Sequence, residues 1–471
     1  MRVLKEFNVD NLNTLSEQLI IPDVKKDGFT ASDFGKDFRW GTATAAFQIE
    51  GAVADDGRGP SIWDTFTKQK GKIKNGHHAD IACDFYNQYE SDLDLVKKLG
   101  FKEFRFSLSW SRILPEGTGK INQKGIDFYN RIIEKCLDLE IEPWITLYHW
   151  DLPQALEDRG GWKNREIVNW FSEYVTLCST EFGDRVKNWI VLNEPTAVAG
   201  LGYTTGMHAP GKKGVFNFLP VVHHLALCNA EGGRIIRDQV KNAYIGTALS
   251  CSHVQAHSDK PKDIRAAQRA DAIMNRLFLE PALGLGYPTD VFPFLNGIKK
   301  LMKPGDEEKL VFDFDFIGLQ NYFRIIVKHS YFAPVLWLEE IPAKKRNVPL
   351  TAMGWEVAPD GMYDILKQFS NYSGVKEIII SENGAAFEDL LEDGKVNDIR
   401  RVEFFQEYLK SILQAKKEGV KVGGYLAWSL LDNFEWAEGY HPRFGLVYVN
   451  YETQERIVKD SGKWFASFLT N

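Results

Sequence analysis

Short apolar runs recur along most of the chain, and each is followed by polar or turn-forming residues. Eight of these runs predict β-strands, at residues 38–45, 103–108, 142–148, 187–193, 243–250, 314–320, 377–382 and 422–429. Between most of them, apolar residues recur three or four positions apart, which predicts amphipathic helices such as 80–99, 123–139, 166–182, 219–239, 266–279 and 400–418. Strands that alternate with helices pair in parallel through right-handed crossovers.

Eight such units close into a (β/α)8 TIM barrel of the α/β class. The alternative is an open, doubly wound sheet, which needs a glycine-rich phosphate turn after the first strand. The sequence from Gly41 to Ala46 does not supply one. Long segments follow three predicted strands, at 46–80, 194–218 and 320–360. We expect them to form long loops over the carboxyl-terminal face, where barrel enzymes hold their active sites.

The domain organisation follows from the absence of any linker, repeat or low-complexity block. We expect one elaborated barrel domain over residues 34–471. Residues 1–33 are polar apart from a short apolar patch at Leu19-Ile20-Ile21, and they show no sustained periodicity. They predict an N-terminal arm that covers the bottom of the barrel, contacts another subunit or does neither. A homo-oligomer is compatible with the sequence but not required by it.

Composition narrows the possible partners. With 471 residues, 44% of them hydrophobic, the chain can bury a large core, and its net charge of −7 argues against a nucleic-acid partner. The five cysteines are widely spaced without a CxxC pair, so neither disulfides nor a zinc site is predicted. No apolar run is long enough for a signal peptide or for a membrane span of about 20 residues. We therefore expect a soluble, cytoplasmic protein that does not bind a membrane.

Two of the predicted strands end on a glutamate. The run Ile378-Ile379-Ile380 leads to Glu382, and the run Trp189 to Leu192 leads to Asn193 and Glu194, with Pro195 next. The carboxyl ends of barrel strands meet at one mouth. Hydrolysis of a glycosidic bond requires two carboxyl groups that flank it, so these two glutamates are a candidate catalytic pair.

Further polar and aromatic residues lie at or near predicted strand ends. Amide, imidazole and indole groups suit a sugar, because its hydroxyls require hydrogen-bond partners and its C–H faces stack on aromatic rings. The candidates at this mouth are Gln48, Arg105, His149, Trp150, Asn193, Tyr322 and Trp428.

The chain resembles the family 1 glycoside hydrolases, of the β-glucosidase type. The matching stretches lie within about residues 34–468, in the order of the family: Phe38 to Gly51, Arg105 to Trp110, Thr146 to Pro153, Leu192 to Pro195, Ser381 to Gly384 and Trp428 to Trp436. The resemblance implies a retaining hydrolase in which Glu194 is the acid/base and Glu382 is the nucleophile that forms a covalent glycosyl-enzyme. A hydrolase of this type needs no metal or organic cofactor, since two carboxyl groups and water suffice for the reaction.

The two carboxyl groups need unequal environments, because one must be ionised and the other protonated. A cation at Arg105 and a hydrogen bond from Tyr322 would lower the pKa of Glu382. Once Glu382 is glycosylated its charge is lost, so the pKa of Glu194 should fall. Retention predicts carboxyl groups about 5–5.5 Å apart. The resemblance also implies that Asn193 binds the sugar 2-hydroxyl.

Other implied roles concern substrate binding. Gln48, His149, Glu435 and Trp436 resemble the residues that bind the non-reducing glycosyl unit, while Trp428 resembles its stacking platform and Trp355 the ring that lines the aglycone side. The expected substrate is a β-glycoside or oligosaccharide with terminal glucose, with fucose or galactose as further possibilities.

Two alternatives remain. A 6-phospho-β-glycosidase is disfavoured because relatives of that type place a serine where this chain has Glu435, whose carboxylate would repel a phosphate. A catalytically silent barrel that binds sugar or protein is disfavoured because both glutamates are present. One departure from the family is Gln320-Asn321-Tyr322, where Asn-Tyr-Tyr is usual, which leaves fine specificity open.

Overall fold

The computed structural model describes residues 28–333 and 335–470, and its centre is a closed barrel of eight strands. Neighbouring strands pair in parallel, as in the register that places Ile380 beside Tyr425. Around the barrel the strands are β1 (Arg39–Ala43), β13 (Val422–Trp428), β10 (Ile378–Asn383), β7 (Phe316–Gln320), β5 (Tyr244–Ser250), β4 (Asn188–Asn193), β3 (Glu142–Tyr148) and β2 (Glu103–Ser107). Each lies within or close to a predicted strand, so the TIM-barrel prediction is confirmed.

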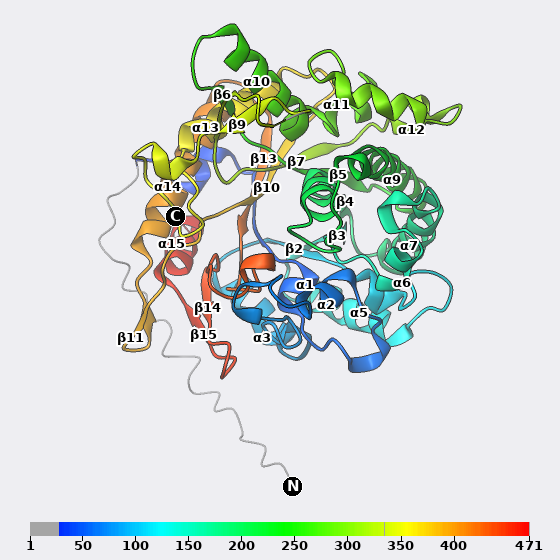
Figure 1. Cartoon of the computed structure of the whole chain (residues 1–471). Helices are drawn as coiled ribbons and strands as arrows, with labels where there is room; N and C mark the ends of the chain where they lie inside the picture. The colour runs from blue at the N-terminus through cyan, green and yellow to red at the C-terminus, as the bar shows by residue number, and fades with distance from the viewer. Residues whose placement is uncertain (1–27, 334, 471) are drawn as a thin grey trace.

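Helices form a ring outside these strands (Figure 1). The longer ones are α3 (Phe85–Lys98), α5 (Gln123–Asp138), α7 (Ile167–Phe182), α9 (Phe218–Gln239), α10 (Pro261–Asp271), α13 (Pro359–Ser370), α14 (Ile399–Lys417) and α15 (Asp460–Thr470). The shorter ones are α1 (Ala46–Ile49), α2 (Ile62–Thr67), α4 (Trp110–Ile113), α6 (Gln154–Asp158), α8 (Pro195–Ala197), α11 (Leu279–Ala282) and α12 (Asp306–Leu310).

Two predicted helix boundaries were wrong. The helix expected at 266–279 is α10, followed by a π-helical turn at Ala272–Arg276 and then α11. It begins earlier because Pro261 occupies its first turn, where the missing N–H of proline is not needed. The helix expected from residue 80 begins at Phe85, after Asp84, whose φ of 51° is left-handed and not helical.

The core has two layers. Inside the barrel, Trp144, Phe316 and Ile379 pack together with small residues. Gly246 is one of these small residues, since a Cβ there would lie 2.4 Å from the ring of Phe316. Between the strands and the outer helices lies the larger apolar layer. Because side chains fill the interior, the carboxyl-terminal mouth is the part of the barrel where an active site is expected.

The long segments after the strands carry additional structure. The segment 320–360 contains β8 (Ile325–His329) and β9 (Leu338–Glu340), which form a three-stranded sheet with β6 (Val254–Ala256). This sheet was not predicted. Two further hairpin-like pairs follow later in the chain: β11 (Leu391–Glu392) with β12 (Lys395–Val396), and β14 (Val447–Val449) with β15 (Arg456–Val458).

Most of the predicted N-terminal arm, residues 1–27, lies outside the described residues. From residue 28 onward the chain packs near the beginning of β1. The ring of Phe29 lies 5.8 Å from that of Phe468 in α15, and the ring of Phe34 lies 4.9 Å from that of Trp40 in β1. Within residues 28–333 and 335–470, none of the helices has the length and apolar character required to cross a membrane.

Candidate active site

Glu382 and Glu194 lie at the carboxyl ends of β10 and β4. Their exposed fractions are 4% and 9%, so both are largely buried. Glu194 has a φ of 45°, in the left-handed region that a glutamate rarely adopts, and Pro195 then begins α8. A strained backbone at a polar, buried position is typical of a functional site.

Gly384 allows the chain after Glu382 to pass close to the end of the neighbouring strand. A Cβ at this position would lie 1.8 Å from the carbonyl oxygen of Trp428. Only glycine lacks this atom, so the Asn383-Gly384 turn brings β10 and the end of β13 together. This proximity places the Glu382 strand next to the loop that carries Glu435.

Three side chains donate hydrogen bonds to the carboxylate of Glu382. Arg105 donates from Nη1 to Oε1 at 2.6 Å, and the hydroxyl of Tyr322 donates to Oε2 at 2.7 Å. Gln320 donates from Nε2 to Oε1 at 2.6 Å. Donors of this kind favour the charged form of a carboxyl group.

Asn193 closes these contacts into a ring. Its Oδ1 accepts from Nη2 of Arg105 at 2.5 Å and from Nε2 of Gln320 at 2.7 Å. The ring runs from Arg105 to Glu382, Gln320 and Asn193 and back to Arg105. Thr146 accepts a further bond from Nε of Arg105 at 2.9 Å, which fixes the guanidinium in its plane.

Gln320 was not among the predicted site residues. Its position offered two signals: it ends β7, and it lies two residues before Tyr322. Its departure from the usual asparagine drew attention only to specificity. In the structure this glutamine touches Glu382 and Asn193 directly.

The ring also determines the proton position on His149. Because Oδ1 of Asn193 accepts from two donors, its Nδ2 faces Nε2 of His149, 3.0 Å away. That imidazole nitrogen must therefore accept, and the proton lies on Nδ1. Burial, and then the charge of Arg105, lower the pKa of His149 well below its usual value, so the ring is neutral. Its buried Nδ1 has no hydrogen-bond partner among the described residues and is free to donate to a ligand.

Gln48 and Glu435 meet on the β13 side of the mouth. Nε2 of Gln48 donates to Oδ1 of Asn433 at 2.9 Å, to the carbonyl of Phe434 at 3.0 Å and, more weakly, to Oε2 of Glu435 at 3.4 Å. The buried Oε1 of Gln48 has no partner among the described residues. The two side chains therefore present an acceptor and a carboxyl group to a ligand.

Aromatic rings surround this polar set. The ring of His149 lies 6.0 Å from those of Trp428 and Trp436, and Trp150 lies 4.6 Å from Trp436. Across the site, Trp355 lies 5.6 Å from Tyr322. These contacts bring the predicted substrate-binding residues together around the two catalytic candidates. Stacking faces beside amide and imidazole groups are what a sugar ring requires.

The two carboxyl groups have unequal electrostatic environments. Burial, and then the negative charge of Glu382, raise the pKa of Glu194 to about 8. Burial also raises the pKa of Glu382, but the charge of Arg105 and the hydrogen bond from Tyr322 oppose that rise. Of the pair, Glu194 is therefore the group favoured to hold a proton, while Arg105 and Tyr322 favour the ionised form of Glu382. Burial, and then the charges of Glu382 and Glu194, also raise the pKa of Glu435 to about 8.

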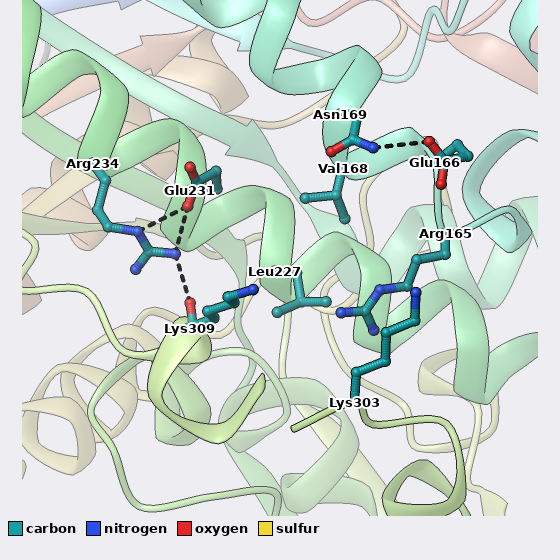
Figure 2. A pocket seen from close by; sticks show the side chains of 9 residues that line it. All are labelled: Arg165, Glu166, Val168, Asn169, Leu227, Glu231, Arg234, Lys303 and Lys309. Carbon is teal, nitrogen blue, oxygen red and sulfur yellow. Dashed lines mark hydrogen bonds and ion pairs between the residues drawn. The ribbon is translucent and has the colours of Figure 1, made fainter. Parts of the chain in front are cut away.

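A cleft of about 210 Å³ lies outside the barrel between α7 and α9 (Figure 2). Arg234 pairs there with Glu231, as Figure 2 shows. Arg165 pairs with Asp306, which lies outside the lining of the cleft. None of the predicted site residues lines it. We therefore place the chemistry at the barrel mouth, where the perturbed carboxyl groups converge.

Comparison with known proteins gives a consistent result. The family model of glycosyl hydrolase family 1 matches residues 30–471. A 1,4-beta-D-glucan glucohydrolase of Thermotoga neapolitana is 46% identical over 440 residues, which are 93% of this chain and 98% of the relative.

Solved structures resemble the whole barrel. A family 1 β-glucosidase from Thermotoga maritima superposes with a TM-score of 0.89 at 45% identity, covering 93% of this chain and 98% of that chain. The β-glucosidase from Thermotoga maritima in complex with deoxynojirimycin gives a TM-score of 0.88 at 44% identity. The match covers 92% of this chain and 98% of that chain. The resemblance inferred from sequence motifs is confirmed.

Proposed function

Because this chain belongs to glycosyl hydrolase family 1, we propose that it hydrolyses terminal, non-reducing β-linked glucosides with net retention of configuration. The observation that carries this proposal is the contrast between the two buried carboxyl groups. Glu382 accepts three hydrogen bonds, one of them from a cation, whereas Glu194 has a pKa of about 8. One group is thus ready to attack and the other to donate a proton.

The reaction has two covalent steps. Glu194 protonates the glycosidic oxygen while Glu382 attacks the anomeric carbon, which releases the aglycone and forms a glycosyl ester. The ester no longer carries the negative charge that raised the pKa of Glu194, so this pKa falls. Glu194 then removes a proton from water, which attacks the same carbon from the face that the aglycone left.

Glycone recognition uses the groups that lack partners inside the protein. Oε1 of Gln48 accepts from a sugar hydroxyl and Nδ1 of His149 donates to one, while Trp428 and Trp436 supply apolar faces. Asn193 retains one amide hydrogen for the 2-hydroxyl. A phosphorylated sugar is disfavoured, because its phosphate would add negative charge beside the ionised Glu382, in a site where such charge already raises the pKa of Glu435.

The aglycone would leave past Trp355. Its ring is partly exposed and packs against Phe323 as well as Tyr322, so it offers a stacking face at the entrance. Since the Thermotoga neapolitana relative is a 1,4-beta-D-glucan glucohydrolase, β-1,4-linked gluco-oligosaccharides are the natural class of substrate to test. A cytoplasmic location, a possible homo-oligomer and the absence of a nucleic-acid partner stay predictions from the sequence.

The test is hydrolysis of a panel of nitrophenyl glycosides, plain and 6-phosphorylated, by the purified protein. We expect turnover of the plain β-glucoside that falls by several orders of magnitude in Glu194→Ala and Glu382→Ala. Glu157→Ala is a matched control, because Glu157 is also a buried glutamate but bonds to Tyr203 and not to any of the predicted site residues. A preference for the phosphorylated glucoside would establish the 6-phospho-β-glycosidase alternative, and an inactive wild type would favour the binding-only barrel.

A further inference from the structure

A network of buried charges lies behind the sugar-binding loops. Five of its six side chains have no solvent exposure, and the sixth, Arg443, is only 17% exposed. Three are cations and three are anions, so the formal charges balance. The members are Lys459, Arg401, Arg443, Asp389, Asp398 and Asp432.

Lys459 joins two loops through one ammonium group. It immediately precedes α15, and its Nζ donates to a carboxylate oxygen of Asp389 and, at 2.6 Å, to Oδ1 of Asp432. Asp389 lies in the loop after β10, the strand of Glu382. Asp432 lies in the loop after β13, three residues before Glu435. Thus a single cation contacts two of the three segments that carry active-site carboxyl groups, those of Glu382 and Glu435.

On the β13 side, Asp432 anchors the glycone-binding loop. Besides Lys459, it accepts from Arg443 at 2.6 Å and from the backbone N–H of Gly445 at 2.9 Å. The next residue, Asn433, receives the 2.9 Å hydrogen bond from Gln48. A displacement of Asp432 would therefore move the Gln48 and Glu435 pair.

On the β10 side, hydrogen bonds of Arg401 connect the charge network to the segment that follows Glu382. Arg401 donates to Asp389 at 2.9 Å and to the carbonyl oxygen of Ala385 at 3.0 Å. Ala385 follows Glu382 by three residues. The network therefore reaches the nucleophile strand as well as the sugar-binding loop.

Stability alone does not account for this arrangement. Desolvation offsets most of the attraction within a buried ion pair, and well-packed apolar side chains are often equally stabilising. What the ionic network adds is direction, because each hydrogen bond fixes an angle and a distance. Here those directions converge on two loops of one active site.

We propose that Lys459 is a positioning residue for glycone recognition, which holds the Glu435 loop in place relative to Glu382. The inference rests on the proposed function. It deepens that function by assigning specificity to a buried lysine that touches no substrate. Its effect must pass through Glu435 and Gln48.

A double-mutant cycle between Lys459→Met and Glu435→Gln tests this path. We expect Lys459→Met to lower kcat/KM for nitrophenyl β-glucoside by about tenfold, mainly through KM, since one well-placed hydrogen bond is worth roughly this factor. In the Glu435→Gln background the same change should cost less than about twofold, because the contact that it positions is already lost. Equal losses in both backgrounds would overturn the proposal.

Two further variants separate positioning from folding. Asp389→Asn keeps the shape of its side chain and removes one charge that Lys459 contacts, so it should reproduce the same non-additivity if Lys459→Met does not fold. Arg165→Met breaks the ion pair with Asp306 on the outer helices and should lower the melting temperature without changing kcat/KM. If both network variants keep wild-type kcat/KM while folded, Lys459 is not a positioning residue. An inactive wild type would instead contradict the proposed function.

Discussion

Arg105 and Glu382 form a buried ion pair with an N–O distance of 2.6 Å. The side chain of Arg105 has no exposed surface and that of Glu382 only 5%. Removal of one partner from a buried pair leaves the other charge uncompensated. The pair therefore keeps Glu382 ionised inside a site whose burial would otherwise protonate it.

Replacement of Arg105 by methionine should raise the pKa of Glu382. Attack requires the ionised form, so the acid limb of the kcat/KM profile should move to higher pH, and the rate at neutral pH should fall by about a hundredfold or more. Initial rates on nitrophenyl β-glucoside across a pH series measure both effects. Arg105→Lys retains a cation and should shift the limb less; an unmoved limb in Arg105→Met would contradict this role.

The alkaline limb should report Glu194. Its pKa is raised to about 8, and only its protonated form can donate to the glycosidic oxygen, so kcat/KM should fall as pH rises through about 8. The pKa read from this limb belongs to Glu194 and Glu382 together, because the two carboxyl groups titrate as a coupled pair.

Glu435 has a similar raised pKa, so it provides the necessary control. With nitrophenyl β-glucoside, Glu435→Gln should retain the alkaline limb of kcat/KM. Glu194→Gln, measured with a dinitrophenyl glucoside whose leaving group departs without protonation, should show no alkaline limb. The reverse result would assign the limb to Glu435.

Azide should distinguish the two glutamates by product configuration. In Glu382→Ala, azide can occupy the place of the carboxylate and attack directly, which gives the α-glucosyl azide. In Glu194→Ala, a dinitrophenyl substrate still forms the glycosyl-enzyme, and azide then attacks from the other face to give the β-anomer. The coupling constant between the protons on C1 and C2 in the NMR spectrum identifies the anomer in each product. The same anomer from both variants would overturn the assignment of roles.

Gln320 should support Glu382 and Asn193 together. Gln320→Leu removes both donated hydrogen bonds at 2.6 and 2.7 Å, so we expect kcat/KM to fall by about ten- to a hundredfold, with a higher acid-limb pKa. Gln320→Asn keeps the amide on a shorter side chain, so its kcat/KM should lie between those of the wild type and Gln320→Leu. A loss in melting temperature with an unchanged pH profile would instead indicate a purely structural side chain.

The strand predictions succeeded where a local pattern was sufficient. The strand β10 is buried along its whole length, so the β-branched run Ile378-Ile379-Ile380 located it to within one residue of the predicted 377–382. β8 and β9 are short and partly exposed, and their sheet depends on β6, some 70 residues earlier, so alternation within segment 320–360 could not predict it.

The same distinction applies to the site. Residues such as Glu194 and Glu382 were predictable because barrel topology brings strand ends together. Gln320 has its partners 62 and 127 positions away, and Lys459 contacts residues 27 and 70 positions away. A lysine beside a C-terminal helix is most often solvent-exposed, and nothing local indicates that this one is buried between two aspartates.

The left-handed backbone of Glu194 implies a conflict between stability and activity. A non-glycine residue in this conformation costs roughly 1 kcal/mol, and its carboxyl group loses hydration as well. Glycine would relieve both penalties at this position but could not donate a proton. Selection for a more stable chain alone would therefore remove the side chain that the reaction needs, and the rest of the barrel must supply the stability that keeps it there.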